Sequence, residues 1–125
     1  MTDVTGFGLI GHAREVALAS KVSLRLFAAE VPLLAGALDC VHAGNLPGGL
    51  KANREFAECL VEYAADVPED LRTMLFDPQT AGGLLIAVDS ADSAFLVAKL
   101  RDAGVPAVEI GEVLPEQKPM IQVVM

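Results

Sequence analysis

Basic residues are scarce in this sequence: 9 Lys and Arg residues stand against 17 Asp and Glu residues, and the formal net charge is −8. Phosphates would be repelled over most of a surface of that sign, so nucleic acid is excluded as the expected partner. A nucleotide is still compatible with this charge, because bound metal ions can neutralise its phosphates locally.

Cysteine is also rare, since Cys40 and Cys59 are the only two in the chain. Two cysteines do not form a disulfide framework, and reduced thiols buried in the core of a cytoplasmic protein are the expected state of both. Cys40 and His42 lie two positions apart, but no second pair with metal-ligand spacing accompanies them, so a zinc site is not expected.

Long apolar runs are absent, and none approaches the ~20 residues that a membrane-spanning helix needs. The N-terminus shows no basic segment followed by an apolar one, so neither a membrane nor a signal peptide is expected. The densest motif of the sequence follows Met1 directly. Because chain termini fray, we expect these residues to be a piece of a longer protein.

The length of 125 residues and a hydrophobic fraction of 53% suit one compact domain with a core. Periodicity and capping signals predict helices from Thr5, Pro32, Asn53, Pro68 and Ser90, and strands at Val22–Phe27, Leu84–Val88, Ala107–Leu114 and Met120–Met125. On the helix from Thr5, Ile10, Ala13 and Ala17 are expected to share one apolar face. The helix from Asn53 is expected to reach Ala64, with Val61 on its apolar stripe. Phe95 is expected on the apolar face of the helix from Ser90. Strands and helices alternate only partly, so the expected class is α+β, with a mostly antiparallel sheet of about four strands covered by helices. The apolar run Leu84–Val88 is expected to be a central, buried strand.

The first motif (residues 2–12) places an acid between hydroxyl groups ahead of a glycine-rich helix start. Backbone N–H groups at such a start can bind an anion, and Gly6 and Gly8 would let a phosphate come close to the backbone. Thr2 and Thr5 flank Asp3, whose carboxylate is a suitable ligand for Mg²⁺ beside that phosphate. The simpler alternative, in which Asp3 or Thr5 only caps the helix, stays open.

The second motif (residues 77–85) combines a carboxylate, an amide and a hydroxyl group ahead of an apolar run. Asp77, Gln79 and Thr80 supply these groups. An Asp-Pro turn followed by glycines that allow close packing is the simpler explanation. Whether these three side chains contact a ligand is left open by the sequence.

Three further features have ordinary structural explanations. His12 is expected to lie on the first helix and to hydrogen-bond a carbonyl group. Three acids at helical spacing, Glu55, Glu58 and Glu62, have no Lys partner between them and predict a solvated helix face. Arg54 could bind a phosphate or could be an ordinary surface arginine.

Both motifs resemble the signature segments of the C-terminal domain of the selenophosphate synthetase (selenide, water dikinase) family. Leu46–Gly49, Asn53–Arg54 and Ile110–Val113 also resemble that family, so the resemblance spans almost the whole chain in the expected order. Ala81 is a departure, because the family often has Ser there. Both residues are small, so this difference changes little.

The resemblance implies the fold of the wider family that includes aminoimidazole ribonucleotide synthetase, in which a C-terminal α+β domain packs against an N-terminal ATP-binding domain. It implies a transferase that converts ATP, selenide and water into selenophosphate, AMP and phosphate, with Mg²⁺ as the metal cofactor. Asp3 occupies the place of an aspartate that helps to bind Mg²⁺ in that family. The expected partners are the N-terminal domain of the same enzyme and a second copy of the full-length chain.

The family's reactive cysteine or selenocysteine and its essential lysine belong to the N-terminal part, so the isolated chain is expected to be inactive. Two alternatives stay open. One is a domain of a related enzyme of the same fold, such as aminoimidazole ribonucleotide synthetase, thiamine-phosphate kinase or the hydrogenase-maturation relative. The other is a binding or dimerisation module without catalytic activity.

Overall fold

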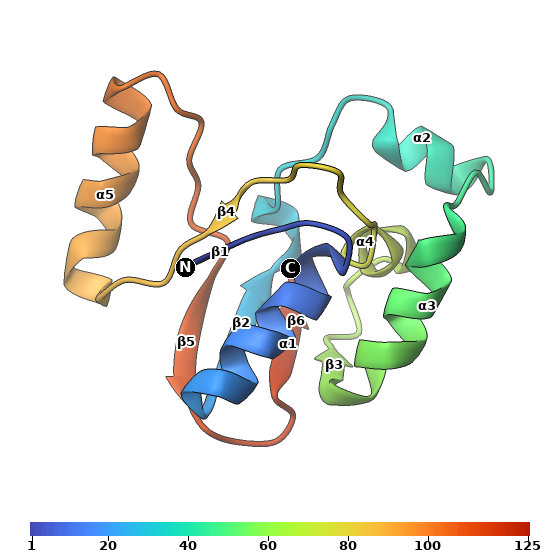
Figure 1. The fold of residues 1–125 in the computed structure, drawn as a ribbon, viewed down its shortest axis with the longest axis horizontal. Helices are drawn as coiled ribbons and strands as arrows, with labels where there is room; N and C mark the ends of the chain where they lie inside the picture. Colours follow the sequence, from blue (N-terminus) through green and yellow to red (C-terminus); the bar gives the residue numbers. More distant parts are fainter.

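Two separate β-sheets organise the chain (Figure 1), and the computed structural model describes all residues from 1 to 125. The elements in chain order are β1 (Thr2–Asp3), α1 (Gly8–Ser20), β2 (Val22–Phe27), η1 (Ala28–Glu30), α2 (Ala37–His42), α3 (Gly48–Ala57), η2 (Glu58–Leu60), β3 (Val61–Tyr63), α4 (Glu69–Met74), β4 (Leu84–Leu85), α5 (Ser90–Asp102), β5 (Gly111–Pro115) and β6 (Ile121–Val124). None of the helices is long and apolar enough to cross a bilayer.

The larger sheet has four strands in the order β3-β6-β2-β5, and the smaller one pairs β1 with β4. The α+β class and the four-stranded sheet are therefore confirmed. The strand directions differ from the expectation: β2 is antiparallel to β5, but β6 is parallel to both β2 and β3. The larger sheet is thus mixed. One of its strands, β3, lies where a helix was predicted.

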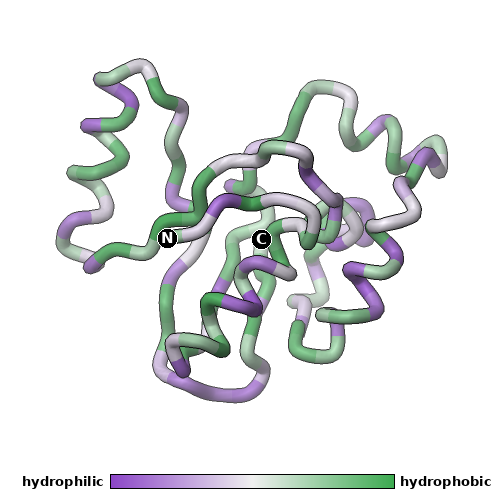
Figure 2. The backbone as a smooth tube through the Cα atoms, viewed as in Figure 1, coloured by the Kyte–Doolittle hydropathy of each residue, from purple (hydrophilic) through white to green (hydrophobic).

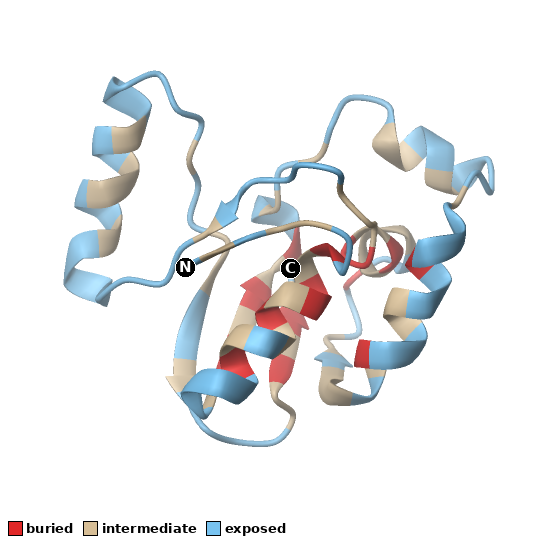
Figure 3. Ribbon diagram, in the orientation of Figure 1, coloured by how far each residue is buried: buried red, intermediate tan, exposed pale blue.

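The core lies between α1 and the central strands of the larger sheet (Figure 3). On α1, Ile10, Ala13 and Ala17 are fully buried, which confirms the apolar face predicted for this helix. Leu24 of β2 and Ile121 of β6 are adjacent across the parallel ladder and are buried with them. Burial of such side chains stabilises the fold by about 25 cal/mol per Å² of apolar surface removed from water.

The helix predicted from Asn53 begins earlier and ends earlier than expected. It runs from Gly48 to Ala57, and the chain then passes through η2 into β3. Val61, which matched the helical stripe, instead pairs with Ile121 of β6. The second helix is likewise shorter than predicted, since α2 begins at Ala37.

The expectation of a central, buried strand at Leu84–Val88 is wrong. Only Leu84 and Leu85 pair, with the two residues of β1, and Leu84 is 62% exposed while Val88 is 43% exposed. Figure 2 shows this segment as a hydrophobic stretch of the tube, and Figure 3 shows that it is largely uncovered. An apolar run is buried on both faces only where other layers cover both faces, and in β4 only Leu85 packs against the core.

The helix α5 also stands apart from the core (Figure 1), and it has no buried residue. Phe95, on the face expected to be apolar and packed, is 65% exposed. The helix is capped by Asp89, whose side chain accepts a hydrogen bond from the Ala91 N–H, rather than by Ser90. In fact, no side chain between residues 77 and 120 is buried in this chain.

Candidate functional site

The two motifs, which are far apart in the sequence, lie directly against each other. The short ladder of β1 and β4 pairs Asp3 with Leu84. Beyond it, the Val4 N–H donates to the Gly83 carbonyl and the Gly82 N–H donates to the Val4 carbonyl, both at 2.9 Å. The backbones approach so closely here that a Cβ atom on Gly82 would lie 2.5 Å from the Val4 oxygen. The second motif therefore needs glycine at this position for packing.

The loop of the first motif is a tight turn in which the Gly8 N–H donates to the Thr5 carbonyl at 3.0 Å. Gly8 has a φ of +70°, and a Cβ atom there would lie 2.7 Å from the Phe76 carbonyl carbon. Gly8 thus lets α1 begin directly against the end of α4. Gly6 has no atom within 4 Å of its Cβ position, so open space for a ligand adjoins Gly6 and not Gly8.

Two backbone donors of this turn are unused. The N–H groups of Gly6 and Phe7 make no hydrogen bond to the backbone, whereas those of Gly8 and Ile10 are taken by Thr5 and Leu75. Free N–H groups ahead of a 13-residue helix can bind an anion, which the positive end of the helix dipole favours. Of the two motif glycines, Gly6 therefore keeps a free N–H group and Gly8 does not.

Thr5 does not cap α1, so that alternative is wrong: the N-cap residue is Phe7, which makes no side-chain cap bond. Instead, His12 reaches back from α1, and its Nε2 accepts a hydrogen bond of 3.0 Å from the Thr5 N–H. The Thr5 hydroxyl lies 3.1 Å from the same nitrogen. His12 therefore lies on the first helix as expected, but it binds an amide donor rather than a carbonyl group, and it holds the Thr5 end of the loop.

Asp3 and Thr2 lie on β1 at the start of this arrangement, with Asp3 exposed and Thr2 half-buried. The Thr2 hydroxyl donates to the Asp3 backbone carbonyl at 3.3 Å. No group of three or more His, Cys, Asp or Glu side chains in the chain could hold a metal ion. A lone carboxylate still fits Mg²⁺, which is often bound by one or two carboxylates together with substrate phosphates and water. The remaining ligands would have to come from a nucleotide or from another part of a longer protein.

Asn53, on α3, connects the two motif regions, although it was not predicted to be a site residue. Its side-chain Nδ2 donates to the Gly6 carbonyl at 2.9 Å and to the Phe76 carbonyl at 3.0 Å. Gly6 belongs to the first motif, and Phe76 directly precedes the second. The only signal in the sequence was the Asn53–Arg54 pair, which contributed to the resemblance alone.

Arg54 is occupied by carboxylates rather than free for a phosphate. It contacts Glu58 Oε1 at 2.7 Å and Glu69 Oε1 at 2.6 Å. The hydrogen bond to Glu58, the largest of the favourable contributions, raises the pKa of the Arg54 guanidinium above its ordinary value, and burial acts in the opposite direction. Glu58 was expected to be a solvated acid without a partner, and that expectation is wrong.

The polar side chains of the second motif lie close to each other. The Gln79 amide donates to the Asp77 carboxylate, and the Gln79 backbone N–H donates to the Thr5 carbonyl at 3.1 Å. Asp77 and Gln79 are half-buried, and Thr80 is exposed. Contact of these three side chains with a ligand stays a prediction.

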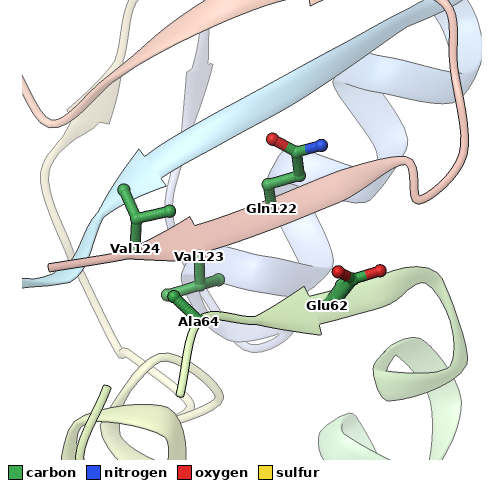
Figure 4. Close-up of a pocket in the computed structure, with 5 residues that line it drawn as sticks. All are labelled: Glu62, Ala64, Gln122, Val123 and Val124. Carbon is green, nitrogen blue, oxygen red and sulfur yellow. The ribbon is translucent and has the colours of Figure 1, made fainter. Parts of the chain in front are cut away.

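A separate shallow hollow of about 180 Å³ lies on the larger sheet (Figure 4) and is lined by Glu62, Ala64, Gln122, Val123 and Val124. The strand register places Glu62, Gln122, Arg25 and Glu112 in one row across this face. Arg25 donates to Gln122 at 3.2 Å and to Glu112 at 2.6 Å. Arg25 is thus paired within the row, and the row contains no residue of either motif, so the hollow is not the candidate site.

The two cysteines are exposed and unpaired. The expectation that they belong to the buried core is therefore wrong. Cys40 lies on α2, which has no buried residue, and Cys59 lies in η2, where the helix predicted to continue has already ended.

Comparisons with known proteins support a single family. Residues 1–124 match the family described as AIR synthase related protein, C-terminal domain. The chain is 44% identical over 116 residues to selenide, water dikinase of Pelobacter propionicus, in an alignment that covers 92% of this chain and 33% of that protein. It is 42% identical over 123 residues to the Pseudomonas aeruginosa protein of the same name, and 36% identical over 124 residues to that of Clostridioides difficile. These two alignments each cover 98% of this chain, and 35% and 36% of the relatives. The chain thus spans about a third of the length of the curated relatives that it matches.

Proposed function

The chain belongs to the family of AIR synthase related protein C-terminal domains, and we propose that it is the C-terminal domain, residues 1–125, of a selenophosphate synthetase. The longer enzyme would use ATP, selenide and water to form selenophosphate, AMP and phosphate. It would be a transferase of the kinase type. This chain would contribute one wall of the nucleotide site.

The observation that carries this proposal is the direct backbone pairing of the two motifs. The segments that resemble the selenophosphate synthetase signatures are joined to each other by backbone hydrogen bonds, from Val4 to Gly83 and from Gln79 to Thr5. They form one continuous surface with an exposed carboxylate and unused N–H groups. The relatives that match over nearly the whole chain carry the name selenide, water dikinase, which supports the same reaction.

The proposed site consists of a carboxylate and a phosphate-binding turn. Asp3 would hold a Mg²⁺ ion that neutralises phosphate charge during phosphoryl transfer. The free N–H groups of Gly6 and Phe7 would bind a phosphate of ATP, with the hydroxyls of Thr2 and Thr5 beside it. Gly8 would contribute indirectly, because its own N–H closes the turn.

The proposed partner is the N-terminal ATP-binding domain of the same chain, and the full-length enzyme would be a cytoplasmic homodimer. The relatives are about three times as long as the matched region, because that region covers 33–36% of them. An additional domain could also cover the apolar segment at β4, since Leu84 and Val88 are exposed in this chain. Exposed apolar surface of this kind is typical of an interface.

The experiment tests the longer chain that carries these residues. It is incubated with ATP, selenide and MgCl2, and selenophosphate, AMP and phosphate are followed by phosphorus NMR. In a matched domain exchange, residues 1–124 replace the corresponding region of the Pelobacter propionicus relative. We expect selenophosphate from both proteins, only when ATP and selenide are both present. A folded longer chain that consumes ATP without forming selenophosphate would point to a related enzyme of the same fold and contradict the proposal.

A further inference from the structure

The side chain of Asn53 is placed to control a peptide group of the first motif. An asparagine amide has two N–H donors, and both of the contacts of Nδ2 are backbone carbonyls, those of Gly6 and Phe76. Phe76 is fully buried, whereas Gly6 is exposed. The side chain therefore links an exposed turn to a fixed point in the core.

The link determines the direction of a free donor. In a planar trans peptide, the carbonyl of one residue and the N–H of the next point in opposite directions. Because Asn53 holds the Gly6 carbonyl, the Phe7 N–H must point away from α3. That N–H donates to no other backbone group.

Other contacts hold the flanking residues, and Asn53 makes the only side-chain hydrogen bond to this peptide group. Thr5 is held by His12 through its N–H, and Gly8 is held by Thr5 and by its close approach to Phe76. Apart from its chain neighbours, nothing lies within 4 Å of the Cβ position of Gly6. Without Asn53, the Gly6–Phe7 peptide could rotate, since glycine restricts its own backbone little.

We propose that Asn53 is a positioning residue, which fixes the Gly6–Phe7 peptide so that the Phe7 N–H faces a phosphate of the bound nucleotide. The role of the Phe7 N–H toward a phosphate rests on the proposed function, whereas the fixing of the Gly6–Phe7 peptide concerns this chain alone. Asn53 touches neither the nucleotide nor the metal ion in this account. It acts through the peptide group that it holds.

The first test is NMR of the 125-residue chain and needs no variant at the start. Asn45 provides an internal control, because it is exposed and its side chain makes no hydrogen bond. The Asn53 side-chain amide protons should exchange with solvent at least about tenfold more slowly than those of Asn45. Equal exchange rates would show that the Asn53 amide does not hold the two carbonyls and would overturn the proposal.

The second test compares Asn53→Asp, Asn53→Ala and the control Asn45→Ala. Aspartate keeps the shape of asparagine but faces both carbonyls with an acceptor. The backbone order parameter at Phe7 should fall from about 0.85 to below about 0.6 in either Asn53 variant and stay unchanged in the control. An unchanged order parameter in a folded Asn53 variant would overturn the inference. If Asn53→Ala does not fold, Asn53→Asp and the exchange rates decide the question.

The third test uses the longer enzyme and separates this inference from the proposed function. Asn53→Asp should raise the KM for Mg·ATP at least about tenfold, as expected for a lost, pre-oriented charge-assisted contact, while Asn45→Ala stays within about twofold. Wild-type KM and kcat in Asn53→Asp would overturn the positioning role even if the loop is looser. If the wild-type enzyme forms no selenophosphate, the proposed function fails, and the two NMR tests still decide whether Asn53 fixes the peptide.

Discussion

Replacing Gly8 by alanine tests the contact that joins the first motif to the end of α4. The φ of Gly8 is +70°, and a Cβ atom would lie 2.7 Å from the carbonyl carbon and 2.9 Å from the carbonyl oxygen of Phe76. These are backbone atoms of a fully buried residue, so they cannot move aside as a flexible side chain would. The left-handed conformation costs alanine about 1–2 kcal/mol, and overpacking adds about 1–3 kcal/mol. We therefore expect Gly8→Ala to lower the free energy of unfolding by about 2–5 kcal/mol.

Two other glycines separate these contributions. Gly44 has a φ of +73° but no atom within 4 Å of its Cβ position, so Gly44→Ala carries only the conformational cost of about 1–2 kcal/mol. Gly6 has neither feature, and Gly6→Ala should change stability by less than about 0.5 kcal/mol. Urea unfolding followed by circular dichroism gives all three values. The reasoning is refuted if Gly8→Ala is no more destabilising than Gly44→Ala.

Three further predictions concern other parts of the chain. Tyr63 is the only tyrosine and there is no tryptophan, so ultraviolet titration reports its phenol alone; burial, and then the charge of Glu58, raises its pKa from 10.0 to about 12. Because the folded chain favours the neutral phenol, this pKa shift makes a pH-dependent contribution to stability of about 1–2 kcal/mol after screening. The contribution is complete below pH 10 and is lost as the pH rises through 12. A titration midpoint near 10 would contradict the raised pKa. Arg54→Met should lower the free energy of unfolding in urea by about 1–2 kcal/mol, because Glu58 and Glu69 lose their partner and solvent screens these partly exposed carboxylates. The exposed control Lys51→Met should change it by less than about 0.5 kcal/mol. Equal effects would argue against the ion-pair network. The isolated chain should form no AMP from ATP, Mg²⁺ and selenide above a control without protein, and any excess would contradict the need for a second domain.

Helices and strands could be predicted from the sequence where the local pattern and the tertiary packing agree. The apolar face of α1 and the strands β2 and β6 are found where periodicity predicts them, because Ile10, Leu24 and Ile121 are buried by each other. Prediction failed at β3, where Val61 continues a helical stripe. Its pairing with Ile121 is a long-range contact that a local pattern cannot reveal.

The burial of β4 was wrong for a related reason. The composition of Leu84–Val88 indicates a buried strand, but burial depends on which layers are present, and this chain supplies only β1. An apolar run therefore reports the environment that a segment favours, not whether the surrounding residues provide it.

The candidate site could be predicted in its parts but not in its assembly. Each motif could be recognised by itself, yet nothing in either one indicates that Val4 would pair with Gly83. Asn53 was missed because its contribution is two hydrogen bonds to carbonyls, and backbone acceptors leave no mark in the sequence. For Arg54 the sequence left a phosphate ligand and an ordinary surface arginine open, because it does not show the contacts with Glu58 and Glu69.

The most direct test of the account is the Mg²⁺ dependence of Asp3→Asn in the longer enzyme. Asparagine keeps the shape of the exposed side chain and removes its charge, and Asp102→Asn, at the exposed end of α5, is the matched control. We expect Asp3→Asn to reduce Mg²⁺-dependent selenophosphate formation by about tenfold or more, because metal neutralisation of phosphates contributes several kcal/mol. Stability should change by less than about 0.5 kcal/mol. Unchanged turnover with an unchanged Mg²⁺ dependence in Asp3→Asn would contradict the assignment of Asp3 to the metal.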